Sequence, residues 1–183
     1  AVGKTSLLRR FVDGSFKDAE LPTKGTDLRA KMTNVDGEAL RLILHDASSM
    51  LQLVERTWGQ VFETFRDARC FLFVYDVSDV ASFDAVEQYL LPTAPAKALK
   101  VLVGNKSDLP VPMVDPARAQ AVAERHGMRH FETSARTGVN VAEAFLTLAT
   151  DVKDRLLAGG GGTVSIFFAA SFSSLHGEGD GVT

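Results

Sequence analysis

Two short apolar runs constrain the fold of this chain most strongly. Residues 71–75 (FLFVY) and 100–103 (KVLV) carry almost no polar residues, and each run ends at a polar turn. Strands that do not alternate between polar and apolar residues are typical of parallel sheets buried on both faces. We therefore expect both runs to be strands inside such a sheet.

Helical patterns alternate with these strands. Residues 83–91 read as a helix that Pro92 ends, and Asp115 followed by Pro116 predicts the start of a helix that ends at Gly127. A last helix is indicated by apolar residues at helical spacing, namely Val141, Phe145, Leu148, Val152 and Leu156. This alternation predicts an α/β fold, with a doubly wound, mostly parallel sheet and flanking helices.

The remaining elements fit the same fold. Residues 4–12 read as an amphipathic helix, and residues 129–132 as a short strand. Residues 28–35 and 39–45 read as strands joined by Asp36 and Gly37, a strong signal for a two-residue hairpin. In doubly wound sheets, ligands bind beyond the carboxyl ends of the strands, so we expect polar residues at those ends to converge on one edge.

Composition indicates one ordinary globular domain. The chain has 183 residues, of which 45% are hydrophobic and 23% charged. A net charge of −3 and the lack of a basic block predict no binding to nucleic acid. Cys70 is the only cysteine, so no disulfide can form within the chain, which favours a reducing compartment.

Two expectations concern the ends of the chain. It begins at Ala1, in the middle of what looks like a motif, so we expect the native N-terminus to be missing. The four consecutive glycines at 159–162 read as a flexible hinge. We therefore expect residues 158–183 to form a glycine-rich hinge and a C-terminal tail.

Gly3, Lys4 and Thr5 form the end of a phosphate-binding loop. Backbone N–H groups at a helix N-terminus bind anions, and a lysine adds a mobile positive charge. The threonine hydroxyl is suited to bind Mg²⁺. Alone, this tripeptide is weak evidence because it arises often by chance.

Asn105, Lys106 and Asp108 form a more specific motif, directly after the strand at 100–103. A carboxylate at this position accepts two hydrogens from the edge of guanine, which adenine cannot supply. Residues 132–136 (ETSAR) follow the short strand in a similar way, and the small Ala135 lets a backbone N–H approach the base. The two motifs together indicate a guanine pocket.

This set of motifs resembles the small GTPases, the Ras-like P-loop GTPases, and looks most like their Rab branch. The similar stretches are 2–20, 75–83, 103–109 and 131–145. The resemblance implies a G domain over residues 1–157, strand order 2-3-1-4-5-6, and binding of GTP or GDP with Mg²⁺. It also implies a molecular switch in vesicle trafficking or signalling, with exchange factors, activating proteins and effectors as partners.

The resemblance assigns roles by position. Lys4 would hold the β- and γ-phosphates, Phe16 would stack on guanine, and Lys106 would cover the ribose. The expected nucleotide-binding residues are Gly3, Lys4, Thr5, Ser6, Phe16, Thr23, Asn105, Lys106, Asp108, Ser134, Ala135 and Arg136. The expected magnesium ligands are Thr5, Thr23 and Asp46, the aspartate acting through water.

The second switch departs from the family pattern. Residues 45–51 read His-Asp-Ala-Ser-Ser-Met-Leu, where the family has Trp-Asp-Thr-Ala-Gly-Gln-Glu. Ser49 replaces the glycine that meets the γ-phosphate, and Met50 replaces the glutamine that orients the attacking water. A thioether cannot orient water in that way, so GTP hydrolysis is left open; Gln52 and Gln60 are candidate substitutes.

Two further departures concern partners and membranes. Lys24 and Leu28 replace an apolar residue and an aromatic residue of Rab effector-binding segments, so the choice of partner cannot be carried over. Because Cys70 is the only cysteine, we expect no prenyl anchor in this chain. The resulting expectation is a cytoplasmic protein that reaches intracellular membranes through partners.

Residues 163–172 (TVSIFFAASF) form an apolar, β-prone segment after the glycines. One reading places this segment in the central slot of the sheet that the family's first strand fills. A disordered tail and a faulty gene model are the alternatives.

Two functions stay open at this point. Thr23 and Asp46 favour a nucleotide-dependent switch that hydrolyses GTP slowly. Ser49 and Met50 favour a degenerate, GTPase-like scaffold without switching. A P-loop kinase or ATPase is disfavoured, because the motif that ends at Asp108 selects guanine.

Overall fold

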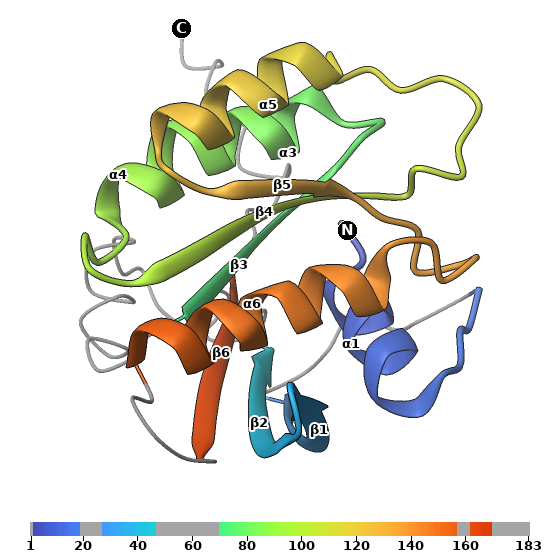
Figure 1. Ribbon diagram of the computed structural model, residues 1–183. Helices are drawn as coiled ribbons and strands as arrows, with labels where there is room; N and C mark the ends of the chain where they lie inside the picture. Colours follow the sequence, from blue (N-terminus) through green and yellow to red (C-terminus); the bar gives the residue numbers. More distant parts are fainter. Residues whose placement is uncertain (1, 19–26, 47–69, 157–161, 170–183) are drawn as a thin grey trace, which may run out of the picture.

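The computed structural model describes residues 2–18, 27–46, 70–156 and 162–169. Within these residues the chain forms a six-stranded sheet with the order β1-β2-β6-β3-β4-β5 (Figure 1). The strands are β1 Asp27–Val35, β2 Glu38–Asp46, β3 Cys70–Asp76, β4 Leu99–Asn105, β5 Arg129–Glu132 and β6 Thr163–Ala169. Only the β1–β2 pairing is antiparallel, so the predicted mostly parallel sheet is confirmed.

Helices cover both faces of the sheet, as a doubly wound fold requires (Figure 1). The helical elements are α1 Lys4–Asp13, α3 Val80–Ala85, the π-helical turn η1 Val86–Leu90, α4 Leu91–Thr93, α5 Pro116–Arg125 and α6 Val141–Leu156. One buried cluster joins α1 and α6 to one face of the sheet, and a second cluster joins α3, η1 and α5 to the other face. None of the described helices is long and apolar enough to span a membrane.

Local sequence signals explain several of these elements. Asp36 and Gly37 form the β1–β2 turn with φ values of 51° and 85°, as a two-residue hairpin turn requires. Asp115 accepts a hydrogen bond from the backbone N–H of Ala117 and so caps α5. All seven residues of β3 are buried, which agrees with the prediction of a central parallel strand.

The bounds predicted for the helix at residues 83–91 differ from those in the structure. The helical segment begins earlier, at Val80, where Asp79 caps the backbone N–H of Ser82. It also continues through Pro92 to Thr93. Proline lacks an N–H and crowds the carbonyl of the preceding turn. The π-helical turn η1, in which Leu91 donates to the carbonyl of Val86 five residues back, relieves this crowding by widening the helix before the proline.

Strand β6 occupies the centre of the sheet. It pairs in parallel with β2 on one side and with β3 on the other. Val164, Ile166 and Phe168 are buried in one cluster and Phe167 in the other, so both faces of the strand are covered. The central-slot reading of this segment therefore holds for residues 163–169, which belong to the same sheet as the rest of the domain. In the family's strand order, this slot belongs to the first strand.

Candidate nucleotide-binding site

Polar residues from the ends of β2 and β4 meet the start of α1, as expected for a doubly wound sheet. The hydroxyl of Thr5, on α1, donates to Asp46 at the end of β2 over 2.6 Å. The side-chain amide of Asn105, at the end of β4, donates to the carbonyl of Val2 over 2.9 Å. A hollow of about 330 Å³ opens between these segments. Its lining includes Gly3, Ser6, Phe16, Asn105, Lys106, Asp108, Ala135 and Arg136.

We distinguish two halves of this candidate site and name them for the roles that the sequence predicts. The phosphate half consists of Gly3, Lys4, Thr5, Ser6 and Asp46. The base-reading half consists of Phe16, Asn105, Lys106, Asp108, Ser134, Ala135 and Arg136.

The phosphate half is built on the N-terminus of α1. Gly3 precedes the helix with a φ of +84°, a conformation that residues with a side chain rarely adopt. A Cβ at this position would lie 2.5 Å from Nδ2 of Asn105, so the close approach also requires glycine. The first turn holds no acidic residue. The backbone N–H groups and positive dipole end of this helix therefore suit an anion.

Lys4 adds a positive charge to this half. The side chain is buried, and burial lowers the pKa of its ammonium group, while the charge of Asp46 raises it in part. A buried ammonium gains stability from an anion close to it. The Thr5 hydroxyl and the buried Asp46 carboxylate supply oxygen ligands of the kind that Mg²⁺ prefers.

In the base-reading half, Asn105 joins three segments. Its amide nitrogen binds the carbonyl of Val2, and its amide oxygen accepts the backbone N–H of Ala135 over 3.1 Å. Its side chain is buried, and both polar atoms of its amide form hydrogen bonds within the protein. Asn105 thus fixes the loop after β5 against the loop before α1.

Asp108 lies at the rim of the hollow and is exposed. The hydroxyl of the buried Ser134 donates to its Oδ1 over 2.6 Å. The Ser134 Oγ in turn accepts the backbone N–H of Thr137 over 3.0 Å. The carboxylate is therefore oriented by the loop after β5 before any ligand binds.

Lys106 has a φ of +67°, and its ammonium group forms an ion pair with Asp76, at the end of β3, over 2.5 Å. Burial alone would raise the pKa of Asp76. Hydrogen bonds from Lys106 and Ser78 outweigh that effect and hold the pKa below its ordinary value. Two neighbouring strand ends are thereby linked beside the hollow.

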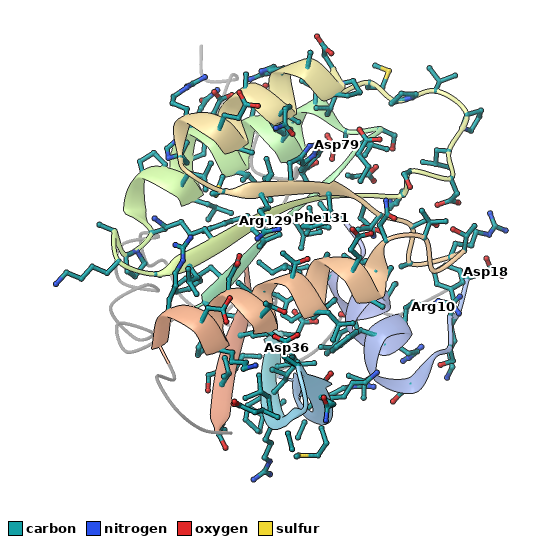
Figure 2. The ribbon with its side chains drawn as sticks, in the orientation of Figure 1. Arg10, Asp18, Asp36, Asp79, Arg129 and Phe131 are labelled. Atoms are coloured by element: carbon teal, nitrogen blue, oxygen red, sulfur yellow. The ribbon has the colours of Figure 1, made fainter. Side chains whose placement is uncertain are left out.

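Arg10 is a site residue that sequence reasoning missed. Its guanidinium donates to three backbone carbonyls, those of Gly14 (2.8 Å), Ala135 (2.7 Å) and Arg136 (2.5 Å). It also lies 6.0 Å from the ring centre of Phe16. Arg10 and Asp18 lie on the same side of the view in Figure 2, next to the loop after β5. Every residue has a backbone carbonyl, so no sequence motif indicates that Arg10 binds these three.

Several predicted residues lie outside the described part of the chain. They are Thr23 and Lys24 of the first switch, and Ser49, Met50, Gln52 and Gln60 of the second.

The fold and this edge define a class of protein. A doubly wound sheet, a helix N-terminus with a buried lysine, and a pre-oriented carboxylate beside it are the parts of a P-loop guanine-nucleotide-binding domain. The Ras family matches residues 1–154. The chain belongs to the Ras family and is a Rab-like small GTPase.

Individual relatives agree with this assignment. The chain is 37% identical to Ras-related protein RAB1BV of Beta vulgaris over 160 residues. This alignment covers 85% of this chain and 73% of that protein. Ras-related protein Rab-1D of Dictyostelium discoideum is 37% identical over 159 residues, 85% of this chain and 76% of that protein. GTP-binding protein yptV2 of Volvox carteri is 38% identical over 160 residues, 85% of this chain and 72% of that protein.

Proposed function

We propose that this chain binds GTP and GDP in the hollow between α1, β4 and the loop after β5, and acts as a Rab-like molecular switch in vesicle trafficking. The observation that carries the proposal is the oriented Asp108 carboxylate at the rim of the hollow, 2.6 Å from the Ser134 hydroxyl. Family membership supports the same conclusion.

Guanine recognition is assigned to Asp108 and to the backbone of Ala135. A carboxylate that accepts two hydrogens selects guanine, because adenine does not offer that pair of donors. Asn105 acts as a positioning residue, since its amide is used to hold Val2 and Ala135 in place. Phe16 lines the hollow and is proposed to stack on the base, and Arg136 to border it.

Phosphate binding is assigned to the start of α1. The groups proposed to bind the phosphates are the N–H groups after Gly3, the Lys4 ammonium and the Ser6 side chain. Of these residues, Gly3 and Ser6 line the hollow. Mg²⁺, when bound, neutralises phosphate charge. The residues proposed to hold it are Thr5, Thr23 and, through water, Asp46. A hydrogen bond of 2.6 Å holds the Thr5 hydroxyl against Asp46, and oxygen atoms of this kind are the ligands that Mg²⁺ prefers.

Hydrolysis is proposed to be slow. Met50 offers no hydrogen bond to an attacking water, and the Cβ of Ser49 restricts the approach that glycine allows. We expect an intrinsic rate on the order of 10⁻⁴ s⁻¹ or below. Single-turnover phosphate release from GTP-loaded protein measures it, and a rate well above that range would mean that another residue positions the water.

Partners follow from the family. We propose that exchange factors, activating proteins and effectors act on this chain, and that it reaches intracellular membranes through such partners.

The proposed function is tested by competition among nucleotides. A fluorescent GDP analogue is bound to the full chain and displaced with GTP, GDP and ATP in the presence of Mg²⁺. We expect GTP and GDP to displace the probe at least about a hundredfold more effectively than ATP, because adenine cannot satisfy Asp108. Equal displacement by ATP would contradict the assignment of guanine recognition.

A further inference from the structure

A second hollow, of about 350 Å³, lies at the opposite end of the strands from the nucleotide site. Its walls come from the connection into β4, the start of β5, the end of α5 and the last turns of α6. The lining residues are Ala96, Lys97, Ala98, Leu99, Lys100, His126, Gly127, Arg129, Asp151 and Arg155. Arg129, labelled in Figure 2, lies well apart from Arg10 and Asp18 at the nucleotide site. None of these residues takes part in the proposed nucleotide function.

The lining of this hollow is strongly cationic. Four side chains that are positively charged at neutral pH, Lys97, Lys100, Arg129 and Arg155, share the hollow with one carboxylate, Asp151. Arg129 pairs with that carboxylate over 3.2 Å. Among the described residues, no carboxylate lies within ion-pair distance of the other three cations. This concentration of charge stands out because the chain as a whole is acidic, with a net charge of −3.

Lys100 differs from an ordinary surface lysine. It is half-buried at the start of β4, and burial lowers the pKa of its ammonium group. Since desolvation is the only cause of that shift, no neighbouring charge compensates it within the described residues. An anion in the hollow would provide this compensation.

Helix termini explain only part of this charge. The hollow faces the carboxyl ends of α5 and α6, and each end carries roughly half a negative charge that favours nearby cations. Two such ends balance about one of the positive charges. Lys97 and Lys100 belong to the connection into β4 and to β4 itself, so they do not serve as the last turn of either helix. Among the described residues, the charge that lines the hollow therefore remains positive.

We propose that this hollow binds a small anion that carries two or more phosphate groups. Several separate cations around a concave site suit several phosphates, since Arg binds phosphate oxygens through paired N–H groups and Lys binds them as a point charge. The volume of about 350 Å³ is within the range of small-ligand sites. Free polyphosphates and phosphorylated lipid headgroups share this chemistry, and the experiment separates them.

The test uses the full chain with its nucleotide site saturated with GDP. Inositol hexakisphosphate is titrated by calorimetry, and the amide chemical shifts of the hollow's residues locate the binding. We expect inositol hexakisphosphate to bind the GDP-saturated chain, with amide shifts centred on Lys100 and Arg129. Shifts centred on the start of α1 instead, or no binding at millimolar concentration, would overturn the proposal.

Matched variants separate a built site from diffuse charge. Lys100→Gln and Arg155→Gln should each weaken binding at least about tenfold, because each removes a charged partner of the phosphates. Arg125→Gln is the control, since Arg125 is a cation at the end of α5 that pairs with Glu87 and does not line the hollow. Equal losses in all three variants would show diffuse attraction only and contradict a site.

The source of the phosphate groups is resolved with vesicles. The GDP-loaded chain is mixed with vesicles that contain phosphatidylinositol bisphosphate, or with phosphatidylserine vesicles of equal total charge. Retention on the first and not the second, with loss in Lys100→Gln, assigns the site to a lipid headgroup. Binding of inositol hexakisphosphate without any retention on vesicles assigns it to a free anion.

Discussion

The two halves of the nucleotide site are held in place by different kinds of interaction. In the base-reading half, side chains of Asn105, Ser134 and Arg10 bind loops that are distant in sequence, through hydrogen bonds of 2.5–3.1 Å. In the phosphate half, the main determinants are a left-handed Gly3, a buried Lys4 and the N-terminus of α1.

This difference indicates which part of the site is ready before ligand binds. In the base-reading half, hydrogen bonds within the protein hold Asn105 and Asp108 in place, so we propose that this half is preorganised for guanine. The phosphate half holds a buried ammonium whose pKa is lowered by burial, so it gains most when an anion arrives. We therefore expect changes in the base-reading half to alter selectivity, and changes in the phosphate half to alter the affinity for every phosphate ligand.

A substitution in strand β6 should have the largest effect on stability, because this strand lies between the two halves of the site. Asp46 of the phosphate half lies on β2, whereas the base-reading half follows β4 and β5, and β6 separates β2 from β3. Ile166→Asp places a carboxylate at a fully buried position and should reduce the free energy of unfolding by about 4 kcal/mol or more. Denaturant unfolding followed by circular dichroism measures this loss.

The matched control for this strand is Thr163→Asp, at an exposed position of β6. It should leave the unfolding midpoint close to that of the parent. Equal stability of Ile166→Asp and Thr163→Asp would mean that β6 does not lie in the sheet.

Lys4→Ala should have the next largest effect. Loss of the buried ammonium should weaken GTP, GDP and inorganic pyrophosphate alike, by about a hundredfold, because all three bind through phosphate. Arg125→Gln is the control and should leave these affinities unchanged, because Arg125 pairs with Glu87 outside both hollows. If pyrophosphate still shifts the amide signals at the start of α1 in Lys4→Ala while GDP binding is lost, the division into two halves is wrong.

Arg10→Gln should have a moderate effect that is confined to the base-reading half. The variant loses hydrogen bonds to the carbonyls of Ala135 and Arg136, so GDP should bind about tenfold more weakly, while pyrophosphate binds as before. Arg10→Lys keeps the charge without the branched donor group and should behave like Arg10→Gln. An equal loss of pyrophosphate affinity would show that Arg10 supports α1 as a whole.

Removal of the ion pair between Asp76 and Lys106 should have the smallest effect on stability. Asp76→Asn keeps an acceptor for Ser78 but loses the charge that faces Lys106, so stability at pH 7 should fall by about 1 kcal/mol. The folded pKa of Asp76 lies below its ordinary value of about 3.9. Its contribution is therefore present above pH 4 and disappears as pH falls through the folded pKa. Urea unfolding of parent and variant from pH 7 to pH 3 tests this; a difference that grows toward acid would contradict it.

Local chemistry explains which elements could be predicted. The hairpin at Asp36 and Gly37 and the start of α5 at Asp115 follow from conformational preferences that act over a few residues. The passage of the helix through Pro92 depends on a π-helical turn with no clear signature. The position of β6 in the sheet depends on parallel pairing with β2 and β3, which are both more than ninety residues away in sequence. Only the assembled sheet determines that position.

The same distinction separates the site residues that could be predicted from the sequence from those that could not. Asn105, Asp108 and Ser134 were predictable, because motifs after strand ends mark the ligand edge of a doubly wound sheet. That topology brings Asn105 and Asp108 to one hollow, and Ser134 binds Asp108 there through its hydroxyl. Arg10 was not predictable, because its partners are backbone carbonyls about 125 residues away, which any residue could provide.

The central claim is that Asp108 reads guanine in a preformed pocket. Asp108→Asn tests it most directly, through the affinities for GDP, xanthosine diphosphate and pyrophosphate, with Asp84→Asn as an exposed control far from the hollow. We predict that GDP affinity falls by about 2–3 kcal/mol, that xanthosine diphosphate becomes the preferred nucleotide, and that pyrophosphate binding is unchanged. A variant that still prefers GDP over xanthosine diphosphate would contradict the account.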